Sequence, residues 1–465
     1  MKSHLKLIFS FSIGTWINAI LSFLLTPIIT YLISPEEFGK ASMFLLVYSV
    51  TLMVTLAGAD QAYIIYFFDR TDKERKKLFW NSIYVSLMFF ALIFVTIIAF
   101  NTPISKFIFG KYYIQGNVLL IFSLLTGIFQ TYVLQSVRML KKGWHYSLLQ
   151  ISKSISNYLV ITMYCLLIAK TFTAILLGQL FANILPVLLS FFLISYLTKP
   201  ERPNSKEMRE ILKTGIPFVP NFMLIWLFQS IDRISLRYYT NFNEIGLYTV
   251  AFKMSLIINV LQDGFTNYWF PLAYEYHSKK KEETDIYVKA NDIATTIFLT
   301  MASLIMLSKE IFFMIIAKQY KSAENVLPFL ILGAAVYALY PTTGIGINLT
   351  KKTYWHLPIS LTAMIFNFVG NTLLVPKLGS IGAAVSTGLS YILFYAVGTL
   401  ISMKLFPIPY NLKKTFFSIF ILLLQAIFET LSNLNFSFKS LSLLFLLILV
   451  VINADTMKKL YLKFH

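Results

Sequence analysis

Five charged side chains interrupt long apolar stretches of the sequence, namely Asp60, Lys153, Arg233, Lys253 and Asp263. A charge at the centre of a bilayer costs about 2.5–3.5 kcal/mol on insertion scales, so such residues usually face a polar cavity and mark a pathway. Arginine offers a planar fork that binds an oxyanion through two N–H groups, whereas lysine acts as a point charge. The three cations therefore predict a stepped path for an anion.

Each of these charges also has a simpler interpretation. Arg233 directly follows Asp232 and would form an ion pair with it, while Lys153 would extend its ammonium group to the inner membrane surface. Asp60 and Asp263 are candidates for coupling to an ion or a proton, or for pairing with one of the cations. The residues alone leave these alternatives open.

The elements that position these charges are predicted to be helices in a membrane. Of the 465 residues, 57% are apolar and 13% are charged, which is about half the charged share of a soluble domain. A spanning helix needs about 20 mostly apolar residues, and helices satisfy every backbone polar group inside hydrocarbon. This composition excludes a soluble enzyme, a soluble nucleotide-binding protein and a disordered scaffold.

Fourteen stretches qualify as spans: residues 7–33, 41–67, 78–100, 116–137, 147–169, 173–197, 214–238, 246–271, 290–308, 326–349, 357–376, 380–403, 412–430 and 439–454. With a cytoplasmic N-terminus, the inner segments carry 27 of the 40 Lys and Arg and the outer segments carry 9, as the positive-inside rule requires. We therefore expect an all-α integral membrane protein with both termini in the cytoplasm. The net charge of +19 then reflects this bias and anionic lipids, not nucleic acid.

The sequence also contains a weak internal repeat. Glu37-Phe38-Gly39 matches Glu244-Ile245-Gly246 at an offset of 207 residues, as do Lys111 and Lys318. At an offset of 210 the matching pairs are Lys141-Lys142 with Lys351-Lys352, Asn157 with Asn367, and Gly178 with Gly388. These matches predict two parallel six-helix halves, residues 1–200 and 201–405, followed by two additional helices in 406–465. Halves of this kind are typical of alternating-access transporters, which bind substrate between them.

Several motifs resemble those of a known family. They are LISPEEFG at residues 32–39, ILKTGIPFVP at 211–220, SIDR at 230–233, EIGLYTVAFK at 244–253 and GSIGAA at 379–384. They are similar to motifs of the Wzx-like, O-antigen-type oligosaccharide flippases, in the multidrug/oligosaccharidyl-lipid/polysaccharide exporter superfamily. The resemblance implies movement of a polyprenyl-diphosphate-linked sugar repeat unit from the inner to the outer leaflet of a bacterial plasma membrane.

The resemblance implies which part of the substrate each predicted polar residue would bind. Arg233, Lys253 and Lys153 would bind the diphosphate, and amides would bind sugar hydroxyls. We select Asn18, Asn221 and Gln229 as the amide candidates. The implied partners are the lipid-linked oligosaccharide, membrane lipids and, in the same pathway, a polysaccharide polymerase or glycosyltransferases.

Two other functions compete with a flippase. A cation-coupled multidrug antiporter of the same superfamily would prefer an acidic lumen, and the charges listed above are nearly balanced. A membrane enzyme such as a polymerase would need a large external loop, which the sequence lacks. The sequence contains no Gly-x-x-x-x-Gly-Lys-Ser/Thr loop, no Gly-x-Ser-x-Gly motif and no histidines at metal-ligand spacing, so we expect no enzyme activity, cofactor or metal.

Overall fold

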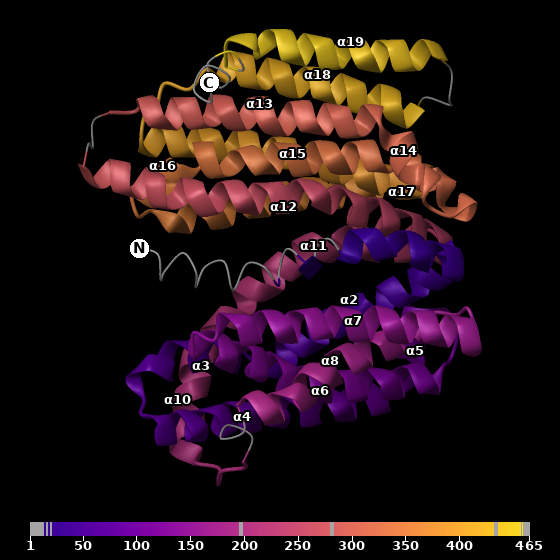
Figure 1. The fold of residues 1–465 in the computed structure, drawn as a ribbon, viewed down its shortest axis with the longest axis vertical. Helices are drawn as coiled ribbons and strands as arrows, with labels where there is room; N and C mark the ends of the chain where they lie inside the picture. The colour runs from indigo at the N-terminus through magenta and orange to yellow at the C-terminus, as the bar shows by residue number, and fades with distance from the viewer. Residues whose placement is uncertain are drawn as a thin grey trace. The chain divides into compact units, whose positions relative to one another are not determined.

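The computed structural model describes residues 14, 17–18, 21–194, 199–279, 283–431, 436–456 and 458, and over these residues it is helical without any strand (Figure 1). The chain divides into two compact units, Met1–Ser230 and Ile231–His465. We call them unit 1 and unit 2 and describe each by itself.

The first continuously described helix of unit 1 is short and apolar, Leu21–Leu32. The predicted first span, residues 7–33, starts outside the described residues. Unit 1 continues with α2 (Pro35–Leu56), α3 (Ala59–Tyr66), η1 (Phe67–Asp69), α4 (Asp72–Ala99), α5 (Asn101–Phe109), α6 (Ile114–Met139), α7 (Gly143–Leu167), α8 (Thr173–Leu193), α10 (Ser205–Gly215), η2 (Ile216–Phe218) and the larger part of α11 (Val219–Tyr239). Helices α6, α7 and α8 pack against one another and run side by side in Figure 1.

Unit 2 contains the end of α11 and then α12 (Phe242–Lys279), α13 (Asp285–Leu307), α14 (Lys309–Met314), η3 (Lys318–Asn325), α15 (Leu327–Thr343), α16 (Ile345–Leu349), η4 (Thr353–Trp355), α17 (His356–Leu405), α18 (Leu412–Leu431) and α19 (Phe436–Ile452). Helix α15 lies in the middle, in contact with α12, α13 and α17, and the α18–α19 pair packs along α13 (Figure 1).

The helices match the spans expected from the sequence. In the described part of the chain, ten helices are long and apolar enough to cross a membrane, and two shorter apolar helices, Leu21–Leu32 and Ser440–Ile452, add to them. Helix α17 covers two predicted spans and is interrupted at Gly379, while α7 lies at the predicted fifth span. The prediction of an all-α membrane protein with about fourteen spans is confirmed.

The Glu-x-Gly motif makes the same kind of contact in both units. In unit 1, Oε2 of Glu37 accepts a hydrogen bond from the backbone N–H of Phe172, just before α8, at 2.9 Å. In unit 2, Oε2 of Glu244 accepts from the backbone N–H of Ser380 at 2.7 Å and from its hydroxyl at 2.6 Å. Gly379 precedes Ser380 with φ +56°, and a Cβ there would lie 2.5 Å from Glu244 Oε2, so only glycine fits this close approach.

The paired lysines also form the same turn in each unit. Lys141 and Lys351 both have a left-handed backbone, with φ of 56° and 59°. The next residue closes the turn each time, with Lys142 N–H donating to Val137 C=O at 3.2 Å and Lys352 N–H to Ile347 C=O at 3.1 Å. Left-handed backbone is uncommon for a residue with a Cβ, so its recurrence at an offset of 210 supports the duplication, which stays a prediction.

Polar contacts fasten the last two helices of unit 2 to α13 and α14. The Ser303 hydroxyl donates to Oε1 of Gln425 at 2.6 Å in the buried interior. Nearby, Nζ of Lys309 lies 3.0 Å from Oε2 of Glu429, and both side chains are buried. Ser442 on α19 donates to the other carboxylate oxygen of Glu429, so one ion pair links three helices.

Candidate functional site

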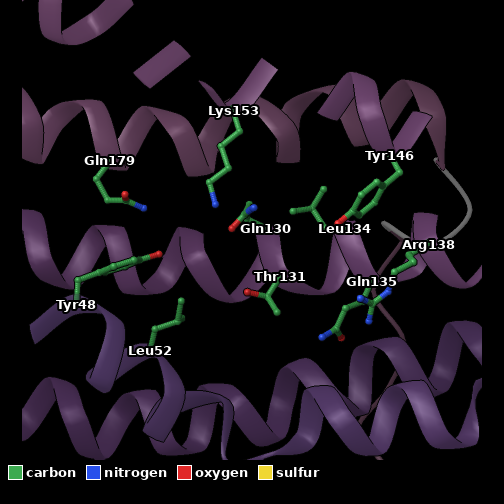
Figure 2. A pocket seen from close by; sticks show the side chains of 10 residues that line it. All are labelled: Tyr48, Leu52, Gln130, Thr131, Leu134, Gln135, Arg138, Tyr146, Lys153 and Gln179. Carbon is green, nitrogen blue, oxygen red and sulfur yellow. The ribbon is translucent and has the colours of Figure 1, made fainter. Parts of the chain in front are cut away.

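Unit 1 contains an open, partly polar pocket of about 330 Å³ between its helices, which we call the cavity. Figure 2 shows the ten side chains that line it, which are Tyr48, Leu52, Gln130, Thr131, Leu134, Gln135, Arg138, Tyr146, Lys153 and Gln179. Eight of the ten are polar or carry a polar tip, and two are cations. An apolar packing defect would have the opposite lining, so this cavity is a candidate binding site.

Helix α6 supplies half of the wall. Thr131, Leu134, Gln135 and Arg138 follow one another at intervals of three, one and three residues and therefore share one helix face. The neighbouring face, which includes Tyr132, is buried in the core, where the Tyr132 hydroxyl donates to Ser82 C=O at 3.1 Å. Burial of that face holds the polar face of α6 toward the cavity.

The charge of the cavity wall is positive. Lys153 extends from α7 into the cavity, and Arg138 lies near the end of α6 (Figure 2). Neither side chain forms an ion pair within the described part of the chain, and none of the ten lining residues is acidic. A cavity with two cations and no carboxylate attracts anions, which supports the anion site predicted for Lys153 over simple extension to the membrane surface.

Protein partners fix two of the three cavity amides. Nε2 of Gln179 donates to Oδ1 of Asn183 at 3.1 Å, and Asn183 in turn donates to the Tyr48 hydroxyl at 2.9 Å. Tyr48 reaches α6 because Gly127 faces its hydroxyl, and a Cβ there would lie only 2.5 Å away. Nε2 of Gln135 donates to Oδ2 of Asp60 at 3.3 Å.

Asp60 lies behind this wall and is only 8% exposed. Helix α2 ends at Leu56, and the next two residues, Ala57 and Gly58, are left-handed, so Asp60 falls in the first turn of α3, where the helix dipole stabilises a negative charge. Its carboxylate accepts hydrogen bonds from Gln61 at 2.6 Å and from Gln135. Asp60 is thus connected to the cavity through Gln135, and its role in ion coupling stays a prediction.

Asp232 in unit 2 forms a closed polar cluster. Its carboxylate accepts hydrogen bonds from the Tyr248 hydroxyl at 2.5 Å, the Thr387 hydroxyl at 2.6 Å and the Asn371 amide at 2.8 Å. In the described part of the chain it forms no ion pair with Arg233. The carboxylate therefore links α11, α12 and α17 and is not the ion-pair partner that the sequence offered for Arg233.

The structure distributes the remaining predicted site residues over both units. Arg233 and Lys253 are half-buried in α11 and α12, and Asp263 is exposed on α12. Asn221 and Gln229 are exposed on the part of α11 in unit 1, and Asn18 is half-buried with an unpartnered Oδ1. Of the eight predicted residues, only Lys153 lines the described cavity, and the stepped path through Arg233 and Lys253 stays a prediction.

Residues 4–277 match the model of a family described as polysaccharide biosynthesis protein. This chain belongs to that family. The match covers more than half of the chain. It includes unit 1 from residue 4 onward, and therefore the whole cavity.

A curated relative points in the same direction. The chain is 19% identical, over 208 residues, to the "Probable low-salt glycan biosynthesis flippase Agl15" of Haloferax volcanii. That match covers 44% of this chain and 44% of the relative, so the chain matches less than half of the relative's length.

Solved structures share the fold. A structure of the "Lipid II flippase MurJ" in an inward closed conformation superposes with a TM-score of 0.71 at 15% identity, covering 98% of this chain and 99% of that one. An inward-facing multidrug resistance MATE family transporter gives a TM-score of 0.59 at 17% identity, covering 86% of this chain and 97% of that one. These solved proteins are named as a flippase and a transporter, not as enzymes.

Sequence reasoning missed most of the cavity of this polysaccharide-biosynthesis family member. Arg138 was assigned to an inner loop, because the fourth span was ended at residue 137, whereas α6 continues to Met139. The periodic spacing of Thr131, Gln135 and Arg138 was the available signal. Gln130 and Gln179 have no such signal, since their position depends on how α6 and α8 pack.

Proposed function

We propose that this protein is a flippase, which moves a polyprenyl-diphosphate-linked oligosaccharide repeat unit from the inner to the outer leaflet by alternating access. The observation that carries the proposal is the cavity of unit 1, where Lys153 and Arg138 stand among amide and hydroxyl groups without any carboxylate. Cations match a diphosphate, and amides and hydroxyls match sugars. The family, whose members act in polysaccharide biosynthesis, supplies the context for such a substrate.

The physical task explains why a polar cavity is needed. Each polar group of the head that enters hydrocarbon without a partner costs several kcal/mol, so the uncatalysed crossing is slow. The cavity replaces the lost hydration of the head, while the polyprenyl tail stays in lipid. An inside-negative membrane potential favours outward movement of the anion by about 2.3 kcal/mol per charge per 100 mV.

The pathway and the location follow from the same proposal. The protein would reside in the plasma membrane of a bacterial cell with both termini in the cytoplasm, where glycosyltransferases complete the substrate. A polymerase on the outer side would then use the product. Arg233 and Lys253, with the amides Asn18, Asn221 and Gln229, are proposed as further contacts along the route, and Asp60 and Asp263 as ion-coupling groups.

The second candidate function is a cation-coupled multidrug antiporter, which the fold shared with MATE transporters favours. The inward-facing MATE structure covers 86% of this chain, whereas the flippase structure covers 98%. A cationic drug would also meet two positive charges in the cavity of unit 1 and no negative one. The charge of the cavity therefore favours the flippase.

Transport by the purified protein in vesicles tests the proposal. A fluorescent polyprenyl-diphosphate-linked saccharide is placed in both leaflets, and the fraction that a membrane-impermeant quencher reaches is followed over time. We expect protein-containing vesicles to equilibrate the two leaflets far faster than protein-free vesicles, and an inside-negative potential to bias the movement outward. Export of a cationic drug without movement of the lipid-linked saccharide would contradict the flippase and favour the antiporter.

A further inference from the structure

Three amides line the cavity of unit 1, and they differ in their partners. Gln179 is held by Asn183, and Gln135 is held by Asp60. Gln130 is only 4% exposed and lines the cavity, yet its side chain has no hydrogen-bond partner among the described residues. Among the described residues, Gln130 has no partner at either polar atom of its amide, whereas Gln135 lacks one only at its Oε1.

The amide of Gln130 opens to the cavity, where water or a ligand can reach it. A ligand group that forms hydrogen bonds there as well as water does can therefore be selected by this amide. Helix α6 places Gln130 beside Thr131, and Figure 2 shows the ends of Gln130 and Lys153 directed into the same part of the cavity. A ligand that brings both an anion and a neutral polar group would satisfy both side chains together.

We propose that Gln130 is a specificity-determining residue, which hydrogen-bonds a hydroxyl or acetamido group of the sugar next to the phosphate bound by Lys153. This inference rests on the proposed function. An amide carries both a donor and an acceptor, so it matches sugar hydroxyl and acetamido groups. An ammonium group carries only donors, so Lys153 matches the phosphate. The two residues divide the recognition of the sugar–phosphate junction between them.

The test compares two soluble probes of the same head, a short-chain prenyl diphosphate and the same diphosphate bearing one sugar. Binding of each probe to the purified full-length protein in detergent is measured by calorimetry. The variant is Gln130→Met, which keeps the length of the side chain and removes both hydrogen-bonding groups. The matched control is Gln115→Met, the same change at an exposed position of α6 outside the cavity.

We expect the wild-type protein and Gln115→Met to bind the sugar-bearing probe about tenfold more tightly than the sugar-free probe, as a good hydrogen bond allows. In Gln130→Met this ratio falls to about one, and binding of the sugar-free probe is unchanged, which also shows that the variant is folded. A variant that keeps the wild-type ratio, or that loses affinity for both probes equally, overturns the role of Gln130.

The outcomes also separate this inference from the proposed function. Wild-type protein that binds both probes equally well would overturn the sugar contact and leave an anion-binding flippase intact. Wild-type protein that binds neither probe would overturn the anion site itself, and the inference with it.

Discussion

The two units place their buried polar groups in different ways. In unit 1, Lys153 and Gln130 line a cavity and have no hydrogen-bond or ion-pair partner among the described residues. In unit 2, Asp232 accepts hydrogen bonds from Tyr248 and Thr387, so its polar groups bind one another. Open polar groups remain available to a ligand, whereas closed ones stabilise the packing. The cavity of unit 1 thus offers open polar groups, whereas the Asp232 cluster of unit 2 is closed by its own hydrogen bonds.

The proposed repeat makes this contrast sharper. The residue 210 positions after Lys153 is Ala363, and the one 210 positions after Gln179 is Leu389. In the other direction, Leu177 stands 210 positions before Thr387. The Glu-x-Gly contacts and the lysine turns thus recur at the proposed offsets, whereas the polar side chains of the cavity and of the Asp232 cluster do not.

Removal of both cavity cations should have the largest effect. We expect the double variant Lys153→Met/Arg138→Met to flip the lipid-linked saccharide at least about 100-fold more slowly, because two charge-assisted hydrogen bonds to the diphosphate are lost. The Tm in detergent should stay unchanged or rise, because an unpaired charge near an apolar interior is unfavourable. Flipping in vesicles and thermal unfolding measure the two quantities.

A single cation outside the cavity gives the matched control for this variant. Lys170→Met removes a charge from the exposed segment between α7 and α8 and should leave both flipping and Tm close to wild type. If Lys153→Met/Arg138→Met flips the lipid-linked saccharide at the wild-type rate, the cavity cations do not bind the diphosphate.

The buried ion pair of unit 2 should show the opposite behaviour. Lys309→Met leaves Glu429 buried without its partner and should lower the free energy of unfolding by about 3–5 kcal/mol. The double variant Lys309→Met/Glu429→Met removes both charges and should recover most of that loss. Thermal unfolding of Lys309→Met, Glu429→Met and the double variant measures the coupling energy between the two charges. If the stability losses of the two single variants simply add up in the double variant, the two charges do not stabilise each other.

The Asp232 cluster should respond in a similar but smaller way. Asp232→Leu leaves the hydroxyl groups of Tyr248 and Thr387 without this acceptor, while the Asn371 amide keeps Asn367, and should cost about 3 kcal/mol of stability. Asp232→Asn keeps one acceptor oxygen and should cost less. If Asp232→Leu lowers the Tm no more than Lys153→Met does, then unit 2 is not stabilised by closed polar contacts, and the contrast between the units fails.

Much of the fold was predictable because it depends on local composition. Long apolar runs and the distribution of Lys and Arg predicted the spans, and the structure contains helices at those positions. The Glu-x-Gly motif and the paired lysines were visible as a repeat, and each proved to be a turn or a cap that depends on neighbouring backbone. Such features are encoded over a few residues, so the sequence carries them.

The site was less predictable because it depends on packing between distant helices. Lys153 was found because a charge in a span is rare, and it does line the cavity. The simpler interpretation of Arg233 paired it with the adjacent Asp232, but donors more than 100 residues away in sequence, on α17, bind Asp232 instead. Gln130 carries no signal at all, because only the packing of α6 against its neighbours makes it an unpartnered amide.

The smallest predicted effect lies outside the cavity, at the loop before α10 in unit 1. Glu201 forms an ion pair with Lys76, and the hydrogen bond within this pair holds the pKa of Glu201 below its ordinary value of 4.5.

A carboxyl whose pKa is lower in the folded state stabilises the fold above the unfolded pKa and loses this contribution as the pH falls through the folded pKa. The difference in Tm between wild type and Glu201→Gln should therefore be small at pH 6 and disappear as the pH falls through the folded pKa of Glu201, which lies below 4.5. Because the pair is partly exposed, added salt should also reduce the difference. A difference that persists unchanged at low pH, where the carboxyl of Glu201 is neutral, would mean that the charge pair with Lys76 contributes nothing to the stability of unit 1.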